Sequence, residues 1–194
     1  MDAAARYNVN SLGRTDRQPI VFAHGFGCDQ HMWRHVAPRF ADDFHVVLFD
    51  HVGAGGSDPL AYDDRRHSTL SGYAADVLEI CSALDLHDVV FVGHSVSAMI
   101  GAASFCRSDP ALAAKFARVT FLSDNRSDLR NVAVPTLVLQ CSDDVIGPVE
   151  VGRYVAGAVP QGRMVLVDAT GHCPQLSHPG ATAAAIADFV HRTT

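Results

Sequence analysis

Short apolar runs alternate with helix-like stretches along the chain. Turn-forming residues bound each run, and few polar positions interrupt it, which is typical of strands covered on both faces of a parallel sheet. The runs occupy residues 19–23, 45–50, 89–92, 136–140 and 164–167. Because strand and helix patterns alternate, we expect one α/β domain over residues 1–194, built as a mostly parallel, doubly wound sheet with helices on both faces.

The clearest helical pattern lies between residues 68 and 84. Its apolar positions recur at helical spacing and predict one buried face. That face contains Leu70, Tyr73, Ala74, Val77, Leu78, Cys81 and Leu84. Further helices are predicted over residues 29–40 and from Pro148 and Pro179, since proline is favoured at the first helical position. Residues 7–12 fit an edge strand.

Composition and charge exclude several classes of protein. With 194 residues, of which 48% are hydrophobic and 19% charged, the chain can form a globular core. The net charge is −6 and no Lys/Arg run is present, so nucleic acid and anionic membranes are not expected partners. The five cysteines form no C-x-x-C pair, and the first residues lack the pattern of a signal peptide, so we expect reduced thiols and a cytoplasmic protein.

The stretch around Ser95 carries the first candidate chemistry. The apolar run 89–92 ends at Gly93, and residues from Val96 onward suit a packed helix. A serine at such a strand–turn–helix junction matches the nucleophile elbow G-x-S-x-G, with the small residue Ser97 at the last position. The competing interpretation is that Ser95 simply caps the helix.

A serine nucleophile needs a base, and the base needs an acid to orient it. In an α/β sheet with this elbow, the acid and then the histidine follow the serine along the chain. The loop after residues 136–140 offers Asp143 and Asp144, and the loop after residues 164–167 offers His172. Because the three residue types occur in the correct order, the prediction of a Ser-His-Asp hydrolase is more specific than the elbow motif alone would allow.

Other motifs are weaker. Glycines follow the strand 45–50, but Asp58 stands where a dinucleotide fingerprint needs glycine, and no helix is expected there. His31 and His35 are four residues apart without a further metal ligand, so we interpret them as solvated side chains. Cys28 and Cys173 flank the expected site, yet neither lies on an elbow, and we expect packed thiols.

Five long motifs together resemble one family. They are AHGFGCDQHMW, LFDHVGAGGSD, GHSVSAMIG, LVLQCSDDVIGP and DATGHCPQLSHP. These are similar to the α/β-hydrolase subfamily of the bacterial stress regulator RsbQ, which includes the plant karrikin and strigolactone receptors. The resemblance implies Ser95 as the nucleophile, His172 as the base and Asp144 as the acid, with Asp143 as the alternative. It also implies an oxyanion hole formed by the amides of Phe26 and Val96.

The resemblance implies further expectations. We expect the substrate to contact Phe26, His94, Phe121 and Ile146. Family members carry a helical lid, and a segment of roughly 70 residues, judged against the family's single-domain size, is absent here. Residues 105–130 are then the remnant of the lid region, and within them residues 118–122 fit either a strand or a lid helix.

We therefore expect an esterase or lactonase acting on small substrates, with no metal or organic cofactor. A second hypothesis is an RsbQ-like signalling protein that senses a small apolar ligand, turns it over slowly and acts through a regulatory phosphatase. A third is an inactive fragment that has lost its lid.

Overall fold

The computed structural model describes residues 2–104 and 124–193. The chain divides into two compact units, Met1–Asn125 and Arg126–Thr194, which we call unit 1 and unit 2. The union of the two units in one domain over residues 1–194 stays a prediction. Phe121 and the segment 118–122 lie outside the described residues, as does most of the expected lid remnant. No helix of the described ranges is long and apolar enough to span a bilayer.

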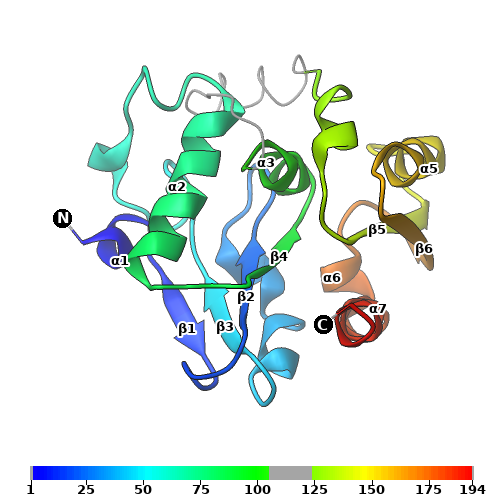
Figure 1. Ribbon diagram of the computed structural model, residues 1–194, viewed down its shortest axis with the longest axis horizontal. Coiled ribbons are helices and arrows are strands. Elements are labelled where there is room, and N and C mark those ends of the chain that lie inside the picture. Colours follow the sequence, from blue (N-terminus) through cyan, green and yellow to red (C-terminus); the bar gives the residue numbers. More distant parts are fainter. Residues whose placement is uncertain (1, 105–123, 194) are drawn as a thin grey trace. The chain divides into compact units, whose positions relative to one another are not determined.

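Unit 1 is built on a sheet with the strand order β1-β3-β2-β4 (Figure 1). The strands are β1 (Asn10–Leu12), β2 (Pro19–Ala23), β3 (His45–Leu48) and β4 (Val90–Gly93). The edge strand β1 is antiparallel to β3, and the other pairs are parallel. The register pairs Ala23 with Gly93, so the loops that follow β2 and β4 leave the sheet side by side. The predicted α/β fold with a mostly parallel sheet is confirmed.

Both faces of this sheet are covered. Val21, Ala23 and Val47 belong to one apolar cluster with residues of α2 (Leu70–Ala83) and α3 (Val96–Ser104), and these two helices contact one another. On the opposite face the Phe22 ring lies 5.2 Å from Trp33 and 5.7 Å from Phe40, measured between ring centroids. Successive residues of β2 thus point to opposite layers, which explains why the strand reads as a continuous apolar run.

The single helix predicted over residues 29–40 is wrong. Two 3₁₀ turns occupy this segment, η1 (Gln30–Trp33) and η2 (Ala37–Phe40). Pro38 explains the break, because a proline inside a helix removes one backbone donor and its ring clashes with the carbonyl one turn earlier. Further 3₁₀ turns are η3 (Pro59–Ala61) and η4 (Asp128–Asn131), and a short helix α1 (Ala3–Arg6) begins the chain.

Two burial predictions need correction. On α2 the side chain of Leu78 is 55% exposed, whereas Ile80, which the predicted face omitted, is buried. On β4 the residues are half-buried rather than buried. The physical reason for the second difference is that β4 is the edge strand of its four-stranded sheet.

Unit 2 contains a parallel pair of strands, β5 (Thr136–Asp143) and β6 (Gly162–Thr170). The helices α5 (Val149–Ala158) and α7 (Pro179–His191) both contact the strands, and the short α6 (Pro174–Ser177) follows β6. Pro179 is the first residue of α7, as predicted, whereas Pro148 is the N-cap of α5 and lies one residue before the helix begins. Cys141, Val167 and Ala169 form the buried centre of the unit.

A buried carboxylate holds three segments of unit 1 together. Asp50, directly after β3, accepts hydrogen bonds from the Asn8 side chain at 2.7 Å, the Gln30 amide at 2.8 Å and the Gly56 amide at 2.9 Å. Burial by itself would raise the pKa of Asp50, but these hydrogen bonds outweigh it, and the pKa lies below its ordinary value. The ionised carboxylate is therefore part of the folded structure.

We predict that Asp50→Asn lowers the free energy of unfolding at neutral pH by about 1–3 kcal/mol, because an amide NH₂ would face donors where the carboxylate accepted. The folded pKa lies below the unfolded one, so this contribution is present above about pH 4 and is lost as the pH falls through the folded pKa. Denaturant unfolding at pH 7 and at pH 3.5 measures the difference, which should shrink at the lower pH. The exposed Asp42→Asn is the control; equal losses for Asp42→Asn and Asp50→Asn would contradict the assignment.

Candidate active site

Ser95 lies at the turn between β4 and α3 in a strained backbone conformation. Its φ is +54°, and the other described non-glycine residues with positive φ are Asn8, Asp85 and Asp88. Asparagine and aspartate tolerate this region, whereas for a serine it costs about 1–2 kcal/mol. Strain of this kind at a strand-to-helix turn is the backbone signature of a nucleophile elbow, because it turns the serine side chain out of the sheet.

The elbow is tight because Gly93 lets α3 approach β4. A Cβ atom at Gly93 would lie 2.5 Å from the backbone oxygen of Ser97 and 2.7 Å from the Ala98 nitrogen. The Ser97 amide donates to the His94 carbonyl at 3.0 Å, and the Ala98 amide donates to the Ser95 carbonyl at 2.9 Å. The helix therefore begins at once after the serine, with the first helical residue Val96 fully buried.

The glycine loop after β2 leaves the sheet beside this elbow. The His94 amide donates to the Ala23 carbonyl at 3.1 Å and so extends the ladder between β2 and β4. A Cβ atom at Gly25 would lie 2.4 Å from His94 Nδ1, so a larger residue here would force the His94 ring to move. Phe26 follows with a 39% exposed side chain. The structure thus brings together, at the ends of adjacent strands, the two residues whose amides are the expected oxyanion donors, Phe26 and Val96.

Asp144 and His172 form a hydrogen-bonded pair in unit 2. The pair comes from the loops after β5 and β6, and Asp144 Oδ2 lies 2.7 Å from His172 Nδ1. The other carboxylate oxygen accepts from the amides of Ile146 at 2.9 Å and Gly147 at 3.0 Å. Asp143 is exposed, and its carbonyl accepts from the Gly171 amide at 2.7 Å. The geometry therefore pairs His172 with Asp144 rather than Asp143.

The electrostatics suit an anion at Asp144. Burial by itself would raise the pKa of this carboxyl. Hydrogen bonds from the Gly147 amide, the His172 ring and the Ile146 amide outweigh this effect, so the pKa lies below its ordinary value. The carboxylate side chain is 6% exposed and the imidazole 24% exposed. A carboxylate held this way orients the imidazole with a proton on Nδ1 and stabilises the imidazolium that forms during proton transfer.

The expected site residues therefore fall into two groups. Ser95, His94, Phe26 and Val96 lie together in unit 1, and Asp144, His172 and Ile146 lie together in unit 2. Ile146 contributes its amide to Asp144, while its side chain is 65% exposed. Their joint action as one site stays a prediction, as does any substrate contact of Phe121.

The competing candidates are less suited to chemistry. Burial raises the pKa of the Cys173 thiol, which keeps it protonated and a poor nucleophile. His31 lies on the surface within 3.2 Å of Asp29, and within the described ranges no three His, Cys, Asp or Glu side chains are arranged to hold a metal ion. The sequence reasoning assigned no role to His24 and His51, which the structure buries beside Ser97; the signal was a polar residue at the end of each apolar run.

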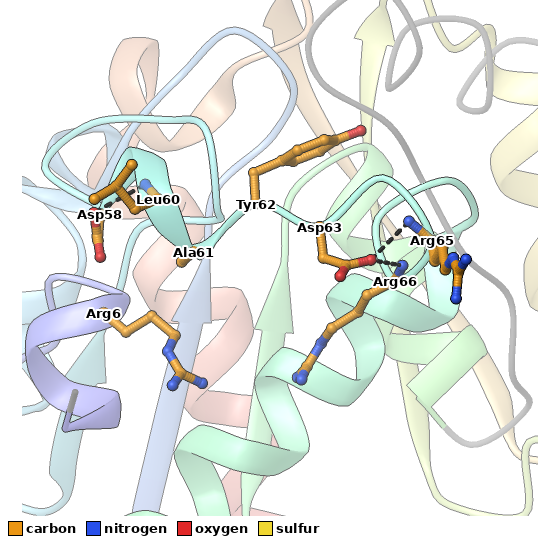
Figure 2. Close-up of a pocket in the computed structure, with 8 residues that line it drawn as sticks. All are labelled: Arg6, Asp58, Leu60, Ala61, Tyr62, Asp63, Arg65 and Arg66. Carbon is orange, nitrogen blue, oxygen red and sulfur yellow. Dashed lines mark hydrogen bonds between the residues drawn. The ribbon is translucent and has the colours of Figure 1, made fainter.

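A surface pocket of about 800 Å³ in unit 1 contains none of the expected site residues. Figure 2 shows Arg6 and Arg66 among its lining residues, and Asp63 bonded to backbone amides. Arg66 pairs with Asp76 at 2.6 Å and Glu79 at 2.7 Å, and Arg6 also pairs with Glu79. Because these carboxylates already balance the two guanidinium charges, we assign no ligand to this pocket.

Comparison with known proteins identifies the family. A family model described as "alpha/beta hydrolase fold" matches residues 18–124, and a model described as "TAP-like protein" matches residues 116–194. The chain belongs to the α/β-hydrolase family. This α/β hydrolase is similar to the karrikin insensitive 2 receptor CA of Petunia hybrida, with 30% identity over 259 aligned positions that cover 95% of this chain and 96% of the receptor.

Two further relatives show the same relationship. The strigolactone esterase D14 of Arabidopsis thaliana is 30% identical, covering 95% of each chain. Among solved structures, a hydrolase from Oleispira antarctica is 29% identical with a TM-score of 0.90, covering 98% of this chain and 96% of that one. This α/β hydrolase therefore has relatives named as receptors as well as relatives named as esterases.

We predict that Gly93→Ala lowers the free energy of unfolding by about 1–3 kcal/mol, because the new methyl group would overlap backbone atoms that have no free rotation. Gly157→Ala is the matched control: it lies in α5 with no atom within 4 Å of the new Cβ, and it should stabilise the helix by about 0.5–1 kcal/mol. Thermal unfolding followed by circular dichroism measures both. A Gly93→Ala protein as stable as the wild type would refute the close approach of α3 to β4.

Proposed function

We propose that this α/β hydrolase cleaves small carboxylic esters or lactones with Ser95 as nucleophile, His172 as base and Asp144 as acid. The observation that carries the proposal is the strained Ser95, a positive-φ serine between a strand and a helix. The Asp144–His172 hydrogen bond and the order of the three residues along the chain support it. The relatives named as esterases support the substrate class.

In the proposed mechanism His172 carries its proton on Nδ1, toward Asp144, which leaves Nε2 as the base. His172 accepts the Ser95 hydroxyl proton while Ser95 Oγ attacks the ester carbonyl. The amides of Phe26 and Val96 stabilise the oxyanion. The tetrahedral intermediate collapses, His172 protonates the leaving alkoxide, and an acyl-enzyme remains. A water molecule, deprotonated by His172, then attacks the acyl carbon, and proton return to Ser95 releases the acid.

A second candidate function is ligand sensing, in which the same residues bind a small lactone and turn it over slowly. The similarity to a receptor over nearly the full length of both chains favours it. A chromogenic acetate ester separates the two functions: many product molecules per protein indicate an enzyme, and a single burst equal to the protein concentration indicates a slow sensor. A chain without a cooperative unfolding transition would point to an inactive fragment.

We also infer that the cover over the site is smaller than in the relatives. The alignment with the Petunia receptor runs over 259 positions, more than the 194 residues of this chain, so some receptor residues have no counterpart here. A smaller cover leaves more ligand surface in water, at about 25 cal/mol per Å² of apolar area. This favours small substrates over bulky lactones.

We predict that Ser95→Ala lowers kcat for 4-nitrophenyl acetate by at least about a thousandfold, which corresponds to about 4 kcal/mol in the barrier, because the triad acts as a unit. The thermal midpoint should hardly change, since only a half-buried hydroxyl is lost. Ser82→Ala, an exposed serine on α2, is the control and should keep full activity. Activity of Ser95→Ala within tenfold of the wild type would remove Ser95 from its proposed role.

We predict that Asp144→Asn lowers kcat by about a thousandfold or more, because an amide donor at this position favours the wrong imidazole tautomer. Asp143→Asn changes the same residue type one position earlier, on an exposed side chain, and should stay within about twofold of the wild type. Steady-state kinetics of both variants at pH 7.5 provide the measurement. If Asp143→Asn is the crippled variant and Asp144→Asn is near normal, the acid has been misassigned.

A further inference from the structure

Three buried polar side chains lie where three neighbouring strands end. His24 follows β2, His51 comes soon after β3, and Ser97 lies on α3 after β4. All three side chains are at most 1% exposed and are surrounded by the apolar cluster of unit 1. Burying a polar group lowers the stability of the fold unless the group is hydrogen-bonded. What these three side chains do therefore depends on their hydrogen bonds.

The hydrogen bonds among them assign each proton. The Ser97 hydroxyl donates to the backbone carbonyl of His24, so its oxygen must accept from His51 Nε2, 2.7 Å away. The His51 amide donates to His24 Nε2 at 3.0 Å, which leaves the proton of His24 on Nδ1. His24 Nδ1 then donates to the carbonyl of Gly25 at 2.9 Å. The network therefore has a fixed direction, from His51 through Ser97 to the backbone.

Both imidazoles are neutral in this arrangement. Burial lowers the pKa of His24 and lowers the pKa of His51 even more, to well below its ordinary value. A neutral His24 accepts on one ring nitrogen and donates from the other, which is what the two hydrogen bonds require.

The backbone that the network holds leads directly to the expected oxyanion donor. The two carbonyls that accept hydrogen bonds belong to His24 and Gly25, the residues immediately before Phe26. Ser97, which supplies the first of these bonds, is the residue after Val96, the other expected donor. One side chain thus joins the two backbone segments whose amides must point at the same oxygen atom.

We propose that Ser97, His51 and His24 are positioning residues that hold the His24–Phe26 backbone in a fixed place relative to the Ser95–Val96 turn. This inference rests on the proposed hydrolase function. Where the elbow motif ends in glycine, as in G-x-S-x-G, the hydroxyl is missing, so this coupling is specific to an elbow with serine at this position. A role in packing alone would require only a small side chain at position 97.

The first experiment compares two buried serines with the same bonding pattern. Ser97→Ala removes a hydroxyl that donates to one backbone carbonyl and accepts one N–H group. Ser57→Ala does the same in the loop after β3, where the hydroxyl donates to the Ala54 carbonyl at 2.7 Å and accepts from the Gly53 amide at 3.2 Å. Both variants should lose thermal stability to a similar degree, which removes stability as the explanation of any difference.

Activity and backbone mobility are then measured on the full chain. With 4-nitrophenyl acetate, Ser97→Ala should lower kcat about tenfold or more with KM within about twofold, because an oxyanion donor acts mainly in the transition state. Ser57→Ala should keep kcat within about twofold. In hydrogen–deuterium exchange, the peptide covering residues 22–28 should exchange faster in Ser97→Ala and at the wild-type rate in Ser57→Ala.

A pair of variants at His51 tests the donor itself. His51→Gln keeps an N–H group that can reach Ser97, and His51→Phe keeps the ring contacts with Phe49 and Tyr73 but removes the donor. We expect His51→Gln to recover most of the kcat that His51→Phe loses. Equal losses in the two variants would show that ring packing, and not the hydrogen bond, is what matters.

The outcomes separate this inference from the proposed function. Equal exchange at residues 22–28 in Ser97→Ala, Ser57→Ala and the wild type would overturn the positioning role, whether or not the protein is an esterase. Full activity of Ser95→Ala would overturn the proposed function while the exchange result still decides the positioning role. Faster exchange together with the kcat loss supports both.

Discussion

The parallel pairing of β2 with β4 is the constraint on which unit 1 depends. Its register sets Ala23 opposite Gly93, so the glycine loop and the turn at Ser95 both begin at the carboxyl ends of adjacent parallel strands. Parallel strands need long crossovers, and here the crossover contains β3 and α2, which cover the sheet and supply His51 and Asp50. The pairing that builds the core therefore also brings together the polar groups that follow the carboxyl ends of the strands.

Unit 2 repeats this principle with a different pair of strands. The register of β5 and β6 shifts between Cys141 and Asp143, and the next residue, Asp144, forms a hydrogen bond with His172. Two amides from the turn that follows donate to the Asp144 carboxylate and hold it in one orientation. In both units a candidate site residue follows the end of a strand, and in unit 1 the absence of a side chain at Gly93 provides the room for the turn.

Sequence patterns predicted the elements that depend on local physics. The strand Pro19–Ala23 and the helix starts next to Pro148 and at Pro179 follow from apolar runs and proline geometry, and the strand and helix on either side of Ser95 follow from the residues around it. The failed predictions have different causes. The exposure of Leu78 depends on which surfaces meet in the folded unit, whereas the break at Pro38 is local and is hidden by the helical spacing of the apolar residues around it. The choice between Asp143 and Asp144 rested on a resemblance, because both follow the same strand. The polar residues His24 and His51 at the ends of apolar runs are visible in the sequence, but their hydrogen bonds with Ser97 are not, because bonds between distant residues leave no periodic signal.

The fixed direction of that network restricts how these residues can change. His24 and His51 are held as opposite tautomers, with ring centroids 4.7 Å apart, so each position accepts only a side chain that donates on the correct side. Replacing one of these side chains leaves a buried donor or acceptor without its hydrogen-bond partner. Only a second replacement, at the partner position, removes that unsatisfied group. The three positions are thus expected to change together, so that an elbow with serine at position 97 and one with glycine there also differ at their buried histidine partners.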